Sequence, residues 1–506
     1  MLQSQIINAL PRRVIASLWA TQETRISLSH LIPNTSPTAT TTTTHHVGKK
    51  DDTQPPPPAI SSKFLSNELP IRFTHILRLL STLSPTALQS PIIKNVSHSY
   101  LRDICTLLHP SLQETSPKAF SKVIEKLQSN QATNLIRLKY ALLQSNPTAA
   151  SVALMENIST ISLGIHLLLD QHISWGLKHN NHAQKICPEE IAHQAVADAR
   201  KTFADILGDD RNIPSISIIN KTDTVNAAIK KRHQPAKDDA FYYVPSVLHR
   251  ILYESTLLSL RAKINFDQEN QLSLSSSSIL TNWLWWKKNK HYQQRATTLK
   301  VFGGPTSIGF RLDTPAPLIE SDLLPGVPKD PIGIPTCSSI LSSTSNTTIE
   351  KNTCIPSFTV ENVAWESLRG WRPAQALASH FGGHLDAMTV EGLGSTIYLA
   401  LDRDISFRER YPNRMVLAPS AQSLLRHHRR TSSAALGLQT APLSKNDNHA
   451  LSIQAASMQL DAFLYAISDS QSQYYYNQQQ YYNNDHYPLH YHQHHSVSLT
   501  AAVGHA

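Results

Sequence analysis

The chain has 506 residues, of which 40% are hydrophobic, and it carries a formal net charge of +9 at pH 7. This length suffices for two or more domains, and we find no apolar run long enough to suggest a membrane-spanning helix. The basic residues are scattered and form no stripe with aromatic residues, which argues against a nucleic-acid groove. The four cysteines lie far apart without a C-x-x-C pair, so the sequence predicts neither a zinc site nor a disulfide framework.

Residues 1–25 have the pattern of a mitochondrial transit peptide. Glu23 is the only acidic residue among the first 50, and three arginines lie between apolar residues that recur at near-helical spacing. A segment of this kind, without the long apolar block of a secretory signal, is typical of import into mitochondria. The alternatives are an ordinary amphipathic helix or a disordered tail. We therefore predict a protein of the mitochondrial matrix.

Residues 33–60 form a low-complexity linker with runs of threonine and proline. The following segment, 62–180, has apolar residues at helical spacing and few β-branched alternations, and it is predicted to be a helical bundle. These patterns indicate that the first domain of the chain is all-helical.

Residues 185–410 are predicted to form a second, α+β domain in which helices pack on a mixed sheet. A helix begins at Pro188 with acidic residues in its first turn. The further elements expected are a strand at 215–219, a helix at 244–262, a hairpin at 298–302 and 307–312, a helix at 373–381, and strands at 385–390 and 395–401. Insertions at 266–290 and 325–356 interrupt this domain, and the Tyr/Gln/His-rich residues 417–506 are predicted to be a disordered tail.

The stretch YVPSVLHRILYESTLLSLRA, residues 243–262, resembles the nucleotide-site helix of the mitochondrial pyruvate dehydrogenase kinase and branched-chain α-keto acid dehydrogenase kinase family. Further blocks stand in the order of that family: ELPIR at 68–72, LGIHLLLDQH at 163–172, PEEIA at 188–192, FGGHL at 381–385 and EGLGST at 391–396. The resemblance implies a helical bundle followed by a histidine-kinase-like ATPase sandwich of helices and strands.

The same resemblance implies a protein-serine/threonine kinase that uses ATP and Mg²⁺ to phosphorylate the E1 component of an α-keto acid dehydrogenase complex. Whether that complex is the pyruvate or the branched-chain one stays open. The E2 lipoyl domain and a paralogous kinase are the other partners implied. By the family pattern Glu254 is the catalytic base, Asp313 contacts adenine, and Gly392, Gly394 and Ser395 lie beside the nucleotide.

Three departures from the family pattern weaken the expectation of catalysis. The family's magnesium-binding asparagine, one helical turn after the glutamate, is Leu258, which offers no oxygen to a hard cation. The first glycine box is replaced by DTPAP at 313–317, and the second by SLRGWRP at 367–373. Proline fixes φ and removes an amide donor, so the first turn cannot follow the original path.

The alternative function is therefore a pseudokinase that regulates the complex, or an active paralogue, without catalysis. No metal ligand is predicted, and the cofactor is either ATP with Mg²⁺ or none. The structural explanation for Glu254 is an ion pair with Arg250, four residues earlier on the helix. Asp313 has the alternative role of a residue that initiates a turn. His166 and Ser162 stand where the family's bundle motif has two arginines.

Overall fold

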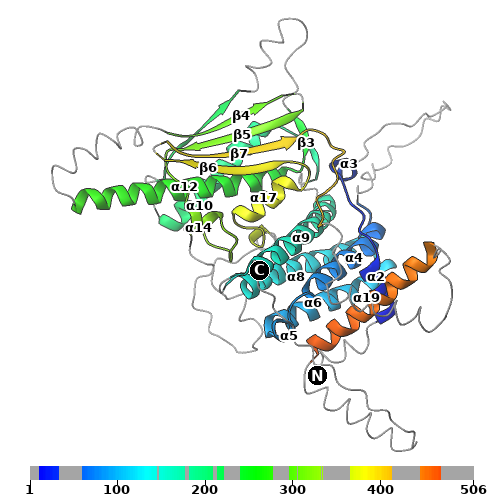
Figure 1. Ribbon diagram of the computed structural model, residues 1–506. Coiled ribbons are helices and arrows are strands. Elements are labelled where there is room, and N and C mark those ends of the chain that lie inside the picture. The colour runs from blue at the N-terminus through cyan, green and yellow to red at the C-terminus, as the bar shows by residue number, and fades with distance from the viewer. Residues whose placement is uncertain are drawn as a thin grey trace, which may run out of the picture.

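The structure is a computed structural model that describes residues 11–32, 60–144, 147–176, 182–208, 213–221, 240–276, 296–304, 306–331, 333, 365–391, 393–412 and 445–468. A helical bundle and a domain of helices and strands lie next to each other (Figure 1). The α+β class predicted from the sequence is confirmed. Nearly all of the predicted linker 33–60 lies outside the described residues.

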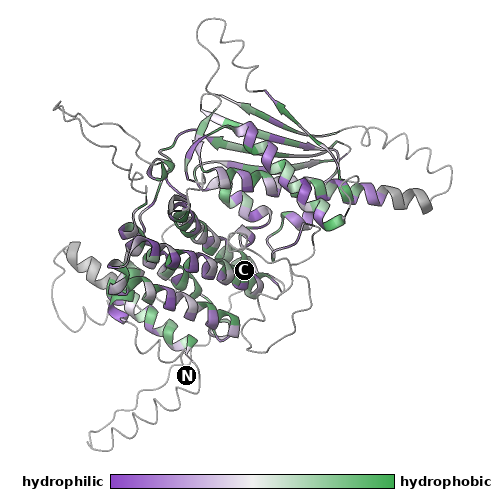
Figure 2. Cartoon of the chain, turned by 180° about the vertical axis from the view of Figure 1, so that it is seen from behind, coloured by the Kyte–Doolittle hydropathy of each residue, from purple (hydrophilic) through white to green (hydrophobic). Residues whose placement is uncertain are grey.

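Four long helices make the bundle: α4 (Ser62–Leu80), α6 (Pro91–Leu108), α8 (Pro117–Leu143) and α9 (Ala149–Gly176), with the short α5 (Pro85–Leu88) and α7 (Pro110–Gln113) between them. Serine caps start several of these helices, and the Ser116 hydroxyl accepts the Ala119 N–H in front of the proline that opens α8. Hydrophilic and hydrophobic residues alternate along these helices (Figure 2), as expected for amphipathic helices that share a core.

Helix α9 departs from one prediction. Its residues 149–174 are apolar and long enough to cross a bilayer by length and composition, with a mean hydropathy of 1.5. The prediction that no segment meets this test is therefore wrong. In the structure most of this apolar stretch is buried, because α9 packs against α8 and α4 in the bundle. A central core helix passes the same composition test as a membrane span.

Helix α2 (Arg12–Ala20) and helix α19 (Lys445–Ile467) pack on each other beside the bundle, although more than 400 residues separate them. The ring of Trp19 is 1% exposed, its centroid is 6.1 Å from that of Phe463, and its Nε1 donates to Gln459 at 3.2 Å. The predicted disorder of 417–506 is thus wrong for 445–468, where apolar residues at helical spacing pack on the apolar face of α2. Residues 413–444 and 469–506 lie outside the described residues.

The same packing contradicts the predicted end of the transit peptide at residue 25. Ile15 and Trp19 belong to the core, and the short helix α3 (Leu28–Leu31) follows them with both of its leucines buried. The amphipathic pattern that resembled a targeting segment is used here to pack α2 between α4 and α19. Residues 12–25 are therefore part of the folded body.

The second domain has a five-stranded sheet in the order β2-β4-β5-β7-β6. Its strands are β2 (Ile216–Asn220), β4 (Thr297–Gly303), β5 (Ser307–Thr314), β6 (His384–Val390) and β7 (Gly394–Asp402), and only the β2–β4 pair is parallel. A two-stranded sheet joins β1 (Gln184–Ile186) to β3 (Phe241–Tyr243). The five strands of this larger sheet lie within a few residues of their predicted positions, whereas the short β1 and β3 were not predicted.

Three helices, α10 (Pro188–Leu207), α12 (Pro245–Ser276) and α17 (Trp371–Ser379), lie between the sheet and the bundle, with the short α14 (Glu320–Leu323) nearby (Figure 1). Helix α12 continues to Ser276, so the insertion predicted at 266–290 begins as an extension of this helix. Most of the rest of the two predicted insertions lies outside the described residues. This arrangement puts α12 and α17 on the side of the sheet that faces the bundle.

After β7 the chain crosses back to the bundle as an extended strap, defined here as residues 403–412. Glu409 lies at its centre and is 1% exposed. Its carboxylate forms an ion pair with Arg72 of α4, at 3.1 Å between Arg72 Nη1 and Glu409 Oε2, and accepts the Ile26 N–H at 3.0 Å. Arg72 also meets Glu68 at 2.9 Å. Gly164 on α9 leaves the room for this pair, since a Cβ there would lie 2.8 Å from Glu409 Oε2.

Candidate functional site

Glu254 lies on the face of α12 that meets α17, and it is 6% exposed. Its Oε2 accepts the backbone N–H of Gly370 at 3.0 Å, and Arg250 Nη2 lies 2.6 Å from its Oε1. Gly370 has φ +108° and is the N-cap of α17, whose first turn contains no acidic residue. The Glu254 carboxylate therefore supplies the negative charge at the α17 N-terminus, in addition to the ion pair with Arg250 that the sequence spacing predicted.

Other buried charges surround Glu254. Lys139 of α8 is 5% exposed, and its Nζ donates to the carbonyl of Ser367 at 2.7 Å. Burial lowers the pKa of Lys139 to about 8, although the charge of Glu254 opposes the change. Arg369 forms an ion pair with Glu366, and burial raises the pKa of Glu366 despite this partner. Five charged side chains thus form one cluster between the bundle and α12.

The metal position of the family pattern does not offer a magnesium site. Leu258 is 6% exposed and belongs to the hydrophobic core. Asp322, a possible substitute ligand, is held by Arg261 at 2.7 Å and by Lys329 at 3.0 Å. Over the described part of the chain no three His, Cys, Asp or Glu side chains are grouped to hold a metal ion. These residues do not fit Mg-ATP held in the manner of the family, because no free oxygen ligand stands one turn from Glu254.

Asp313 lies near the end of β5 and is held by three neighbours. Its carboxylate meets Lys300 at 2.7 Å and Arg311 at 2.8 Å, and it accepts the Thr396 hydroxyl at 2.8 Å. Burial acts to raise the pKa of Asp313, but the hydrogen bonds from Lys300, Arg311 and Thr396 outweigh it and lower the pKa.

The next residue, Thr314, meets the Ser259 hydroxyl of α12. Because alternate residues of a strand point to opposite faces, Asp313 points away from α12 and from Glu254. The structure does not bring these two predicted site residues together.

The structure does bring Gly394 and Ser395 against the 313–317 turn. Gly394 has φ +101°, and a Cβ there would lie 3.1 Å from Ala316 N and closer still to the Thr314 carbonyl. The Ser395 hydroxyl donates to the carbonyl of Ala316 at 2.7 Å, and Ala316 is fully buried. The two residues thus hold the turn onto the end of the sheet. Gly392 lies outside the described residues.

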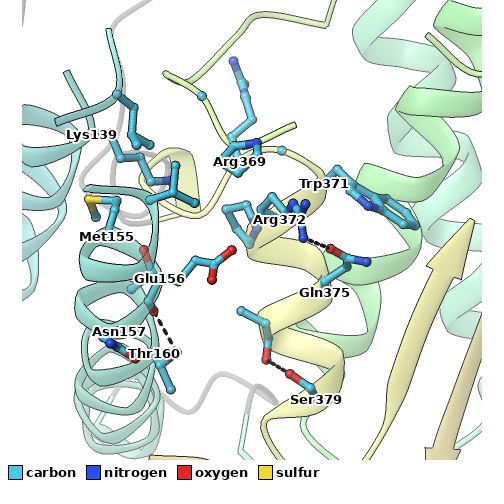
Figure 3. Close-up of a pocket in the computed structure, with 18 of the residues that line it drawn as sticks. Lys139, Met155, Glu156, Asn157, Thr160, Arg369, Trp371, Arg372, Gln375 and Ser379 are labelled. Carbon is cyan, nitrogen blue, oxygen red and sulfur yellow. Dashed lines mark hydrogen bonds between the residues drawn. The ribbon is translucent and has the colours of Figure 1, made fainter. Parts of the chain in front are cut away.

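A cavity of about 1200 Å³ separates α8 and α9 of the bundle from α12 and α17. Nine lysines and arginines and five aspartates and glutamates line it. Figure 3 shows Glu156 of α9 extending into this cleft opposite α17, and Lys139 and Arg369 at one end of it. Arg372 of α17 donates to the Leu323 carbonyl at 3.1 Å and to Gln375 at 3.4 Å, which are neutral partners.

The structure thus combines a helical bundle with a domain of helices and strands, and a cleft lies between α8 and α9 of the bundle and α12 and α17. Residues 41–197 match a family model described as "Mitochondrial branched-chain alpha-ketoacid dehydrogenase kinase". The chain is also 23% identical over 362 residues to "[Pyruvate dehydrogenase (acetyl-transferring)] kinase, mitochondrial" of Arabidopsis thaliana, a match that covers 68% of this chain and 85% of the relative. The chain is thus similar to the pyruvate dehydrogenase kinase and branched-chain α-keto acid dehydrogenase kinase family, and both matches carry names that place those proteins in mitochondria, which supports a mitochondrial location.

Sequence reasoning missed Lys139 and the role of Gly370. Lys139 lies between Leu135 and Leu143, each four residues away on one buried face of α8, so a buried lysine could have been recognised there. Gly370 gave no such signal, because its partner Glu254 lies 116 residues away.

Proposed function

We propose that this chain is a non-catalytic member of the pyruvate dehydrogenase kinase and branched-chain α-keto acid dehydrogenase kinase family that regulates a mitochondrial α-keto acid dehydrogenase complex. It would act by binding the E1 or E2 component, or an active paralogous kinase. The observation that carries the proposal is the Glu254 carboxylate, which is bound on one side by Gly370 N–H and on the other by Arg250.

A general base must be free to accept a proton from the attacking hydroxyl. Glu254 instead serves as the anion at the N-terminus of α17, a place where backbone N–H groups commonly meet phosphate. Phosphoryl transfer depends on oriented amides and a metal ion, and loss of one such donor costs about 3 kcal/mol, roughly a hundredfold in rate. The Leu258 side chain and the 313–317 turn remove further contacts of this kind.

The second candidate is an active kinase, favoured by the position of Glu254 on the wall of the cleft. In that case Glu254 would leave Gly370 and accept the proton of a serine hydroxyl. A thermal-shift titration with ATP, with and without magnesium, separates the two candidates. The expected result is no magnesium-dependent rise in melting temperature, whereas a catalytically active relative in the same assay shows one.

The variant Leu258→Asn is expected to bind Mg-ATP no better than the wild type, because Glu254 keeps both of its partners. Magnesium-dependent ATP binding by the wild-type protein, lost in Glu254→Gln, would contradict the proposal. The partner is tested separately by affinity purification from mitochondria, in which an E1 or E2 component or a paralogous kinase should co-purify. Recovery of unrelated matrix proteins alone would remove the proposed partner.

A further inference from the structure

The cleft has a second end, where the strap crosses to the bundle. We call it the strap end and define it by four arginines that line the 1200 Å³ cavity: Arg25, Arg78, Arg408 and Arg410. Arg410 Nη1 donates to the hydroxyl of Ser379, the last residue of α17, at 3.3 Å. Glu254 meets the other end of this nine-residue helix, which is about 13 Å long. The strap end is therefore separate from the site around Glu254.

The two strap arginines point to the same side. Glu409 between them is buried, whereas Arg408 and Arg410 are exposed. The backbone here is extended and forms a β-bridge between Ser27 and Arg408, so alternate side chains share a face and lie roughly 6.6 Å apart along the strap. Arg410 has the neutral partner Ser379, and Arg408 has no carboxylate partner among the described residues. The strap thus presents two arginine side chains to the cleft without matching acids.

Most carboxylates that line the cleft already have a cation. The pairs are Glu254 with Arg250, Asp322 with Arg261 and Lys329, and Glu409 with Arg72. Glu254 Oε1 makes no hydrogen bond, but it lies 2.6 Å from Arg250 Nη2, so its charge is matched. Asp330 lies beside the Arg261 group, since Arg261 Nη2 donates to its carbonyl at 2.8 Å. Glu156 of α9 is exposed, and it has no ion-pair partner in the part of the chain that the structure describes.

Positive charge still exceeds negative charge when every one of these acids is counted. The nine lining cations and the partners Arg72 and Arg250 make eleven positive charges, with histidines taken as neutral. The five lining acids and the partners Glu23, Glu68 and Glu366 make eight negative charges. The cleft as a whole is therefore complementary to an acidic ligand.

An apolar wall adjoins the strap end. Leu79 follows Arg78 near the end of α4, Leu143 ends α8, and Leu154 and Met155 belong to the first turns of α9; all of these leucines and the methionine line the cavity. A cleft with an apolar wall and a cationic end suits a ligand that has both apolar and acidic groups. Its volume exceeds that of most small-molecule pockets, roughly 300–1000 Å³, which favours a peptide segment.

We propose that the strap end and this apolar wall bind an extended, acidic segment of a partner protein. Carboxylates at alternate positions of an extended peptide repeat at the spacing of Arg408 and Arg410, because both backbones rise about 3.3 Å per residue. Arginine and carboxylate form charge-assisted and often bidentate hydrogen bonds. Apolar side chains of the same segment pack on the wall formed by α4, α8 and α9.

A nucleic acid fits this surface less well than an acidic peptide. Single-stranded nucleic acids stack their bases on accessible aromatic rings. The aromatic residues that line the cleft, Trp371 and Tyr411, are both buried. The inference goes beyond the proposed function and does not depend on whether Glu254 takes part in catalysis.

Fluorescence anisotropy on the full chain tests the inference with three labelled probes. They are a short peptide that alternates glutamate and leucine, the same peptide with glutamine for glutamate, and a single-stranded DNA of the same charge as the first. The glutamate peptide should bind, more weakly as salt is added, and the glutamine peptide should not. Arg408→Gln together with Arg410→Gln should weaken binding at least about tenfold. Both arginines are exposed, so the fold is kept, and Arg102→Gln with Lys118→Gln, two exposed cations of the bundle, is the matched control.

Glu156→Gln gives a test of opposite sign. Glu156 extends into the cleft opposite α17 (Figure 3), so removal of its charge should strengthen binding of the glutamate peptide about twofold or more. Unchanged or weaker binding by this variant overturns the inference, as does equal affinity in the wild type and the double arginine variant. Absence of peptide binding, or binding of the DNA alone, overturns it too. No nucleotide or magnesium is present, so failure here leaves the Mg-ATP titration and the proposed function standing, and the reverse also holds.

Discussion

The buried contact between the strap and the bundle predicts that Glu409→Gln destabilises the protein and loosens the strap. Glu409 is bound by Arg72 and by the Ile26 N–H, and His380 Nε2 lies 3.4 Å from its Oε2. Glutamine keeps the shape of the side chain but removes the charge that balances Arg72. Glu68 then remains as the carboxylate partner of Arg72.

The pKa of Glu409 gives the magnitude. Burial acts to raise it, but the charge of Arg72 and the hydrogen bonds from His380 and Arg72 outweigh burial and lower the pKa from 4.5 to about 2. At about 1.4 kcal/mol per pKa unit, the ionised carboxylate contributes about 3 kcal/mol to folding. This agrees with the roughly 3–5 kcal/mol measured when one partner of a buried ion pair is removed. Because the folded-state pKa is depressed, this contribution is present above pH 4.5 and is lost as the pH falls toward 2.

Chemical denaturation at pH 7 should therefore show Glu409→Gln less stable than the wild type by about 3 kcal/mol. Hydrogen exchange should also become faster at the strap amides, because Glu409 N–H bonds to the Ile26 carbonyl and Arg410 N–H to the His380 carbonyl at 2.8 Å. Asp404→Asn removes an exposed carboxylate from the same strap and should change little. If the two variants lose equal stability and exchange alike, the buried ion pair does not hold the strap and the reasoning fails.

Three further predictions follow from buried or constrained residues. Burial raises the pKa of Asp103 to about 6, so its stabilising effect is greatest below pH 3.8 and is lost as the pH rises through 6. Asp103→Asn should therefore stabilise the protein at pH 7 by up to about 3 kcal/mol and give no gain at pH 3.5; the same stability for both proteins at pH 7 would refute this. Gly394→Ala should lower the melting temperature by several degrees, because φ is +101° and the Cβ meets the 314–316 backbone, whereas Gly326→Ala has open space and should not. N-terminal sequencing of the protein isolated from mitochondria should find a mature terminus ahead of Arg12, and a terminus after residue 25 would contradict the packing of Trp19.

Local patterns in the sequence predicted much of the fold. The hairpin of β4 and β5 and the strands β6 and β7 lie close to the positions predicted for them from the sequence. Helix α4 lies where apolar residues recur at helical spacing. Helix α19 was missed because its apolar face is diluted by polar residues and the Tyr/Gln/His-rich segment follows it. Its partner α2 was misread for a related reason, since a core helix and a targeting helix share one amphipathic pattern.

The site was less predictable than the fold because its contacts are long-range. The spacing of Arg250 and Glu254 gave their ion pair, as helical neighbours four residues apart must meet. Nothing local indicates that Gly370 caps its helix with Glu254, or that Lys139 from the bundle reaches the carbonyl of Ser367. The residue type of Asp313 was informative, but the sequence did not show which face of the sheet its side chain points to. Side chains of successive residues in a strand point to opposite faces.

The packing of α2 on α19 means that the start of the chain can complete its folding only after residues near the C-terminal end have been synthesised. During synthesis the Ile15 and Trp19 side chains emerge hundreds of residues before Phe463 and Leu464 can cover them. The apolar face of α2 therefore stays exposed to chaperones and to neighbouring chains until α19 has been synthesised. A nascent chain stopped short of Lys445 keeps that surface uncovered.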